Sequence, residues 1–165
     1  MVLKFRASIP GSKVFMREYE VRGETSLYEL HSYLTDDMGF SPDQMVLFRG
    51  VDSKGTIGGE YGLFDFGDGA MDSVSLSELL KKGEKTLLYV FDLKRERYIK
   101  LDCIGEAEES LRFAYPRLVA EKGRNPEQFA KGYDDLDQVD EPFREIPEEP
   151  VYDDAELPEG EEFTE

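Results

Sequence analysis

The chain has 165 residues and a formal net charge of −17, which is the size of one ordinary domain with a strongly acidic balance. A single cysteine, Cys103, excludes an internal disulfide and a multi-cysteine metal cluster, and a single histidine, His31, excludes any mechanism that needs two. No apolar run approaches the ~20 residues of a membrane span, and the alternating N-terminus lacks the apolar block of a signal peptide. We therefore expect a cytoplasmic protein that binds no membrane and needs no cofactor.

The first half of the chain predicts a hairpin followed by one main helix. Alternating apolar residues over 3–9 and 14–21 indicate two strands joined by a turn at 10–12, with Arg17 interrupting the apolar face of the second strand. A capping box at Ser26 and Glu29 and apolar residues at helical spacing predict a helix that ends at Gly39. Two short strands, at 45–48 and 61–66, then flank a flexible glycine-rich loop at 50–60.

The second half predicts a short helix and a second hairpin. A capping box at Ser75 and Glu78 begins the helix, and residues 86–91 and 98–104 form the hairpin around a turn at 92–96. Pro116 interrupts the stretch 106–119, and residues 121–132 are expected to be a surface loop. This order predicts an α+β fold in which a mixed or antiparallel sheet of two hairpins packs on one main helix, with a β-grasp-like first half.

Most of the negative charge is concentrated at the C-terminal end. Residues 133–165 hold one basic and 15 acidic side chains and four prolines, so they bury too little apolar surface to offset the entropy of ordering. We expect one domain over residues 1–132 and an acidic tail over 133–165 that is largely extended or disordered. Tyr133, Phe143 and Tyr152 are candidate anchors on a basic partner or on the chain's own domain, and the simpler alternative is a solubilising tail.

A basic cluster lies at the turn of the second hairpin. Lys94, Arg95 and Arg97 stand beside Tyr98, a combination that can contact phosphates and stack on a base. The net charge of −17 opposes binding to a polyanion. The alternative is a solvated hairpin tip that the chain's own acidic tail covers.

His31 and Asp92 are the weak candidates for catalysis. A lone histidine at the edge of an apolar stripe is usually a packed residue, and as a general base it needs a nucleophile and an orienting carboxylate nearby. Cys103 has no basic residue within two positions to lower its pKa, which favours an inert buried thiol. The acidic residues in 65–72 lack the spacing of a calcium loop, so no metal site is predicted.

A series of short motifs follows one order along residues 1–133. They are Met16-Arg17, Thr25-Ser26-Leu27, Leu30-His31, Met38-Gly39-Phe40, Met45, Phe48, Tyr89-Val90-Phe91-Asp92, Tyr115-Pro116-Arg117, Pro126-Glu127 and Gly132-Tyr133. In this order they resemble the Ri-plasmid ORF-3-like family, also labelled transposon-passenger TnpR-like proteins, with the MM3350-like fold. The resemblance implies an α+β fold and specifies no activity. The polar residues that follow the hairpin aspartate in the family are replaced here by residues 93–97, so a site at that place keeps only His31 and Asp92.

Three functions remain, in order of preference. The first is a non-enzymatic module that binds a protein partner, with a basic partner favoured by the charge of the tail. The second is a mobile-element accessory protein that contacts nucleic acid through the basic hairpin at Lys94–Arg97. The third is a hydrolase or metal-dependent enzyme that uses His31 with Asp92. The sequence does not fix the oligomeric state.

Overall fold

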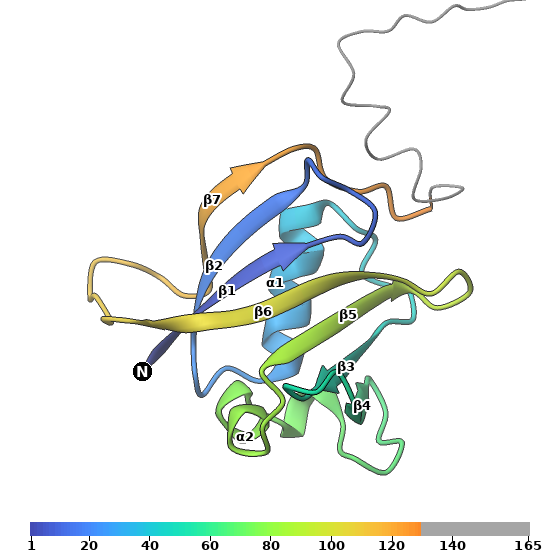
Figure 1. Ribbon diagram of the computed structural model, residues 1–165, viewed down its shortest axis with the longest axis horizontal. Coiled ribbons are helices and arrows are strands. Elements are labelled where there is room, and N and C mark those ends of the chain that lie inside the picture. The colour runs from blue at the N-terminus through green and yellow to red at the C-terminus, as the bar shows by residue number, and fades with distance from the viewer. Residues whose placement is uncertain (130–165) are drawn as a thin grey trace, which may run out of the picture.

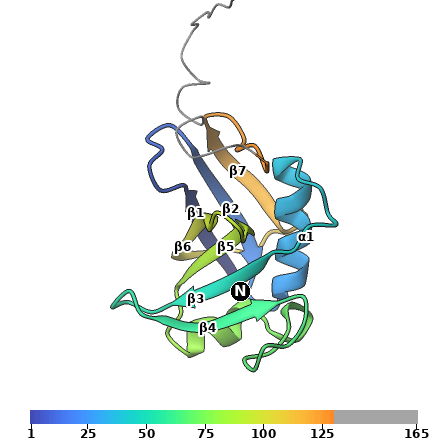
Figure 2. The same cartoon turned by 90° about the vertical axis from the view of Figure 1, so that its right-hand side faces the viewer.

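The structure is a computed structural model that describes residues 1–129, which form one antiparallel sheet with a helix along one face (Figures 1 and 2). The seven strands lie in the order β4-β3-β5-β6-β1-β2-β7, and each neighbouring pair is antiparallel. The elements are β1 Val2–Ser8, β2 Met16–Arg22, α1 Leu27–Met38, β3 Leu47–Val51, β4 Ile57–Gly62, the 3-10 turn η1 Met71–Ser73, α2 Leu76–Lys81, β5 Thr86–Asp92, β6 Arg97–Ala107 and β7 Arg117–Lys122. This architecture is consistent with the predicted α+β class, but the seven-stranded sheet dominates it and is larger than the predicted pair of hairpins.

Helix α1 begins and ends where the sequence predicts. Ser26 and Glu29 form the reciprocal capping box, and Gly39 ends the helix in the left-handed conformation at φ 72°. The buried side of the helix packs on the inner face of the sheet around Phe5 and Phe48, and together they form the hydrophobic core. The second capping box, at the start of α2, is also present. Both helices are therefore fixed by local signals that can be read without knowing the fold.

The glycine-rich loop predicted at residues 50–60 is wrong, because most of it is the β3–β4 hairpin. Gly50 and Gly58 lie in the two strands, and a Cβ atom at either position would overlap the carboxylate of Glu84. That buried carboxylate accepts a hydrogen bond from Tyr61 Oη at 2.8 Å, and Lys82 Nζ donates to the same hydroxyl at 2.7 Å. The glycines are thus needed for the close approach of Glu84, and the strand predicted at 61–66 begins and ends earlier.

The last strand, β7, was not predicted. It pairs with β2 along the edge of the sheet, in the stretch that Pro116 was expected to interrupt. Residues 123–129, expected as part of a surface loop, cross the end of the sheet after β7 and contact both Arg17 and Arg97. We call residues 123–129 the C-terminal strap. The prediction of a domain over 1–132 and a tail over 133–165 extends beyond the described residues.

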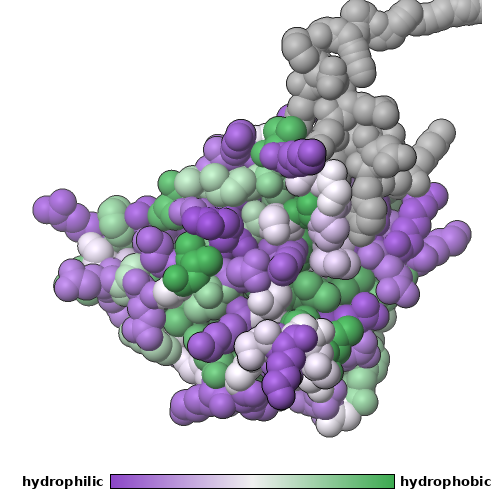
Figure 3. Space-filling model, viewed as in Figure 1, coloured by the Kyte–Doolittle hydropathy of each residue, from purple (hydrophilic) through white to green (hydrophobic). Residues whose placement is uncertain are grey.

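The face of the sheet away from α1 carries charges of both signs, and Figure 3 shows hydrophilic and hydrophobic residues interspersed on it. Arg6 pairs across the strands with Glu18 at 2.9 Å, and Arg117 pairs with Glu20 at 3.0 Å. The Arg6–Glu18 pair is exposed, and exposed pairs of this kind add little stability, whereas the Arg117–Glu20 pair is partly buried. Within residues 1–129, this face therefore offers no single-sign surface for a polyanion.

Candidate functional site

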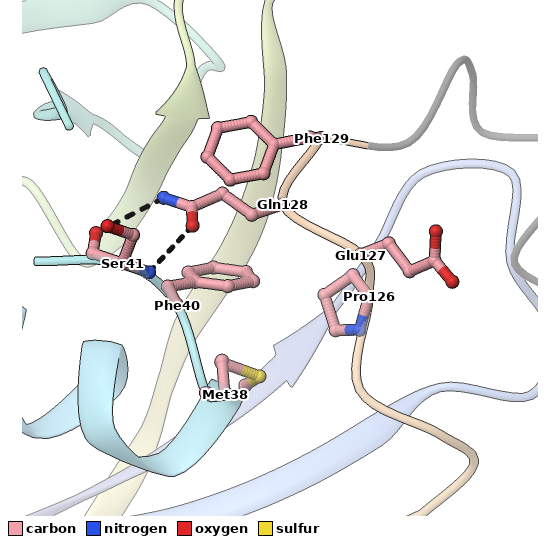
Figure 4. Close-up of a pocket in the computed structure, with 8 residues that line it drawn as sticks. Met38, Phe40, Ser41, Pro126, Glu127, Gln128 and Phe129 are labelled. Carbon is pink, nitrogen blue, oxygen red and sulfur yellow. Dashed lines mark hydrogen bonds between the residues drawn. The ribbon is translucent and has the colours of Figure 1, made fainter.

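Two adjoining hollows lie where the loop after α1, the β5–β6 turn and the C-terminal strap meet. The first has a volume of about 520 Å³ and is lined by Met38, Gly39, Phe40, Ser41, Pro126, Glu127, Gln128 and Phe129 (Figure 4). The second has a volume of about 450 Å³ and is lined by Asp43, Gln44, Met45, Phe91, Asp92, Leu93, Lys94, Arg95, Gln128 and Phe129. Gln128 and Phe129 line both, and we call the two hollows together the C-terminal groove.

Segments that are distant in the sequence converge on this groove. Gly39-Phe40, Met45, Phe91-Asp92 and Pro126-Glu127 are four of the motifs that carry the family resemblance, and all of them line one hollow or the other. The fold therefore gathers these motif segments at one end of the sheet. This convergence identifies the groove as the candidate functional site.

Arg97 holds one wall of the groove from inside. Its side chain is 1% exposed, and its Nε donates to Asp92 Oδ2 at 2.9 Å. Its two terminal nitrogens donate to the backbone carbonyls of Glu127 and Gln128 in the strap. The guanidinium also lies over the Phe91 ring, 5.0 Å from the centroid. Arg97 was predicted as a binding residue at the hairpin turn, whereas the structure buries it and directs its donors to its own chain.

Asp92 is the negatively charged partner of Arg97 in this contact. Partial burial opposes its ionisation, but the backbone N–H of Arg95 and the guanidinium of Arg97 hold the pKa of Asp92 below its ordinary value. The carboxylate is thus charged at neutral pH and shared between the hairpin turn and the buried arginine. Its place in the structure is that of a counter-ion to Arg97.

A second buried arginine fixes the start of the strap. The Arg17 side chain is 2% exposed and donates to the carbonyls of Lys122 at 2.7 Å and Gly123 at 3.0 Å, and to Asn125 Oδ1 at 2.7 Å. Its guanidinium lies over the Phe15 ring at 4.4 Å from the centroid. The charged residue that interrupts an apolar strand face in the sequence is therefore an anchor for the strap.

Gln128 joins the strap to the loop after α1. Its buried amide oxygen accepts from the backbone N–H of Ser41 at 2.7 Å, and its amide nitrogen donates to the carbonyl of Ser41 at 3.4 Å (Figure 4). Asn125 adds a hydrogen bond to the carbonyl of Asp37 at 3.2 Å. These contacts place the two walls of the groove at a fixed separation.

The groove exposes apolar side chains beside cations. Phe40 and Phe91 stack in its interior with ring centroids 4.9 Å apart. Among the other lining residues, Met45 is 51% exposed and Phe129 is 67% exposed. Leu93, the next residue that lines the hollow, is also exposed, and Lys94 and Arg95 follow it on the hairpin turn. An apolar centre with a charged rim is the usual composition of a protein-binding surface.

The remaining predicted site residues do not join this arrangement as a catalytic set. His31 lies in the core with Nδ1 2.7 Å from Tyr89 Oη and 3.4 Å from Thr35 Oγ1, and burial lowers the pKa of the imidazole. Burial also raises the pKa of Tyr89 to about 12, against the opposing hydrogen bond from Thr35. Asp92 pairs with Arg97 instead of with His31. The structure therefore does not bring the two catalytic candidates together.

The other residues of the basic hairpin separate in the structure. Tyr98 is half-buried and lies on the opposite face of β6 from Arg97, because consecutive side chains of a strand alternate between faces. Only Lys94 and Arg95 of the predicted cluster line the groove.

Several further predictions concern other parts of the chain. Cys103 is half-buried, and burial raises the pKa of its thiol. Within residues 1–129, no three His, Cys, Asp or Glu side chains are placed to hold a metal ion, and neither helix has the length and apolarity of a membrane span. The candidate anchors Tyr133, Phe143 and Tyr152 lie outside the described residues.

Sequence reasoning missed Ser41, Gln128 and Phe129 as site residues. Ser41 and Gln128 meet only because the strap crosses the sheet, and nothing in either local sequence signals that contact. Arg17 did carry a signal, since a charged residue between apolar strand positions requires a buried partner. That signal predicts a buried hydrogen-bond partner for Arg17 but does not indicate that the partner is the strap.

Comparison with known proteins agrees with the resemblance read from the motifs. The sequence model of the family described as plasmid pRiA4b ORF-3-like protein matches residues 3–163. The crystal structure of the protein of unknown function MM3350 from Methanosarcina mazei Go1 is similar, with a TM-score of 0.70, 19% identity, and coverage of 84% of this chain and 80% of that one. At this identity the likeness shows a shared fold. No curated protein is a significant match.

Proposed function

The chain belongs to the plasmid pRiA4b ORF-3-like protein family, and we propose that it is a non-enzymatic module that binds another protein in the C-terminal groove. The observation that carries this proposal is the exposure of Met45 and Phe129, at 51% and 67%, in a recess rather than on a convex surface. Exposed apolar side chains that gather in a recess commonly mark interaction sites. They differ in this from apolar residues scattered singly over a surface.

The rigidity of the walls supports the same function. The strap is held to the rest of the domain by hydrogen bonds of Arg17, Arg97 and Gln128. A surface that is already in its binding conformation loses less entropy when a partner binds. The groove is therefore suited to receive a flexible segment, which supplies most of the conformational change itself.

The chemistry of the groove indicates what such a segment contains. The exposed Met45 and Phe129 favour an aromatic or aliphatic anchor, and Lys94 and Arg95 on the rim favour carboxylates beside it. The partner segment is thus an extended acidic stretch with one or two large apolar residues. A basic protein partner, which the tail's charge favours, is a separate proposal that concerns residues 133–165 and not the groove.

A nucleic-acid accessory function is the second candidate, and the exposed Lys94 and Arg95 are the observation in its favour. Arg97 is committed to Asp92 and to two carbonyls, so the hairpin turn presents two cations instead of three. Two phosphate contacts give a shallow salt dependence, in which log K falls by about 1.4 units per decade of salt for a single strand and about 1.8 for duplex DNA. This is weak support for a chain whose net charge is −17.

Three probes distinguish these functions in the full-length protein. They are a random copolymer of glutamate and tyrosine, a random copolymer of lysine and tyrosine, and a single-stranded oligonucleotide, each titrated by isothermal calorimetry. Groove binding predicts that the acidic copolymer binds and that Lys94→Glu with Arg95→Glu weakens it by about tenfold, since each rim charge contributes modestly. The matched control is Lys54→Glu with Lys81→Glu, two exposed lysines outside the groove.

The outcomes separate clearly. Binding of the acidic copolymer that the groove pair weakens and the control pair leaves unchanged supports the groove. Binding of the oligonucleotide alone, lost in the groove pair, transfers the assignment to the nucleic-acid function. Equal loss in the groove and control pairs contradicts the groove as the binding surface.

A further inference from the structure

The described chain ends inside the wall of the groove. Phe129 lines both hollows, so the residues that follow it begin at the groove. Tyr133 is four residues further along, and four extended residues span at most about 14 Å. The first aromatic residue of the acidic tail is therefore tethered within reach of the exposed Met45 and of Lys94 and Arg95.

The composition of that segment complements the groove. Residues 133–137 read Tyr-Asp-Asp-Leu-Asp, which is two large side chains, Tyr133 and Leu136, among three carboxylates. Lys94 and Arg95 place two positive charges on the rim, and Asp92 carries its charge between Arg97, with which it is paired, and Arg95. Asp43 and Glu127 also line the groove, and Asp43 accepts hydrogen bonds from its neighbours, so the favourable charge is confined to the side of the hairpin turn.

We propose that residues 133–137 of the same chain occupy the C-terminal groove and compete there with the partner segment. This inference rests on the proposed function, because it assigns an internal occupant to the same surface. A tether of a few residues gives an effective concentration of the order of millimolar, so even a weak contact is substantially occupied. An external segment must therefore bind the groove with enough affinity to displace the tethered residues 133–137.

Occupancy of the groove by the tail would link the binding of a basic protein at the tail to the binding of an acidic segment in the groove. A basic protein that binds the acidic tail withdraws residues 133–137 from the groove by neutralising their carboxylates. The groove then accepts its own ligand. Binding at the tail and binding at the groove are thus positively coupled, and by linkage each raises the affinity of the other.

The absence of tryptophan from the whole chain permits a direct test. Tyr133→Trp in the full-length protein introduces a single indole at the proposed anchor, and Phe163→Trp introduces one near the far end of the tail as the control. Occupancy of the groove predicts that acrylamide quenches the indole at position 133 at least about twofold less than the one at position 163, because the tethered contact is at least half occupied. Its emission maximum is correspondingly shifted to shorter wavelength.

The charge variants show whether the groove is responsible for the shielding. Adding Lys94→Glu with Arg95→Glu is expected to raise the quenching at position 133 to the level of the Phe163→Trp control, and adding Lys54→Glu with Lys81→Glu is expected to leave it unchanged. Equal quenching at positions 133 and 163 overturns the inference. Shielding that survives the groove pair overturns it as well, because it places the segment elsewhere.

This test is independent of the one for the proposed function. Copolymer binding at the groove together with an unshielded indole removes the inference and retains the function. An indole that is shielded in the parent protein and exposed by Lys94→Glu with Arg95→Glu supports the inference. If the acidic copolymer fails to bind even after Asp134→Asn and Asp135→Asn weaken the competing tail, the proposed function is rejected instead.

Discussion

Replacing Arg97 with methionine tests whether this residue is a structural anchor or a ligand-binding residue. Arg97→Met keeps an unbranched side chain over Phe91 but removes every donor to Asp92 and to the two strap carbonyls. Breaking a buried pair by removing one partner costs about 3–5 kcal/mol. The Asp92 side chain is 14% exposed and so keeps some water, which favours the lower end of that range, whereas each orphaned carbonyl adds about 1 kcal/mol.

We therefore expect Arg97→Met to lower the free energy of unfolding by about 3–5 kcal/mol, a large part of the 5–15 kcal/mol that is typical of a domain. Urea unfolding followed by far-ultraviolet circular dichroism measures this change. Lys94→Met, at the exposed position of the same turn, is the control and is expected to change stability by about 0.5 kcal/mol or less. Adding Asp92→Asn to Arg97→Met is expected to recover part of the loss, because it removes the unpaired charge. A loss below about 1 kcal/mol for Arg97→Met refutes the anchor assignment.

Three further predictions concern buried contacts in the groove, in the β3–β4 hairpin and in the core. Gln128→Ala is expected to cost about 1–2 kcal/mol and to speed hydrogen exchange at the Ser41 amide, and unchanged exchange there contradicts the strap contact. Gly50→Ala forces a Cβ against the buried Glu84 carboxylate and is expected to cost about 1–3 kcal/mol in urea unfolding; a neutral effect is inconsistent with this packing. His31 has a folded-state pKa below the ordinary 6.5, so the unfolded state binds the proton more readily and stability falls as the pH drops through that range. His31→Gln is expected to remove this part of the pH dependence, and an identical pH profile for both proteins argues against a buried neutral imidazole.

Local signals in the sequence predicted local structure well. Ser26, Glu29 and Gly39 bound α1 because capping satisfies backbone groups within one helical turn, whatever the tertiary environment is. Alternation likewise identified β1 and β2, and a continuous apolar run identified β5. These elements are encoded within a few residues, so periodicity and capping suffice to find them.

The errors arose where a distant contact decides the structure. Gly50 and Gly58 were interpreted as part of a flexible loop. They are glycines because the side chain of Glu84, far along the chain, occupies the space that a Cβ atom would take at either position. Strand β7 and the strap are held by Arg17 and Arg97, and neither arginine carries information on which carbonyls it meets. For the same reason the basic hairpin was read as four surface residues, and only the fold shows that one of them is buried.

The candidate site was predicted in part. The hairpin turn with Lys94 and Arg95 was identified from charge, and these two residues do line the groove. The apolar side chains beside them, Met45 and Phe129, were missed because exposure cannot be read from a single apolar residue between polar ones. The sequence thus located one wall of the groove and not the opposing one.

Site-specific photo-crosslinking in cells of the native host tests the central claim most directly. A photoreactive amino acid replaces either Met45, in the loop that lines the groove, or Ile57 on strand β4, two positions with nearly equal exposure of 51% and 50%. If the groove is a protein-binding surface, irradiation of the full-length protein yields a discrete heterologous adduct from position 45 and none from position 57, and Lys94→Glu with Arg95→Glu removes it. Equal adducts from both positions, or none from position 45, contradict the assignment of the groove as the site where this protein binds its partner.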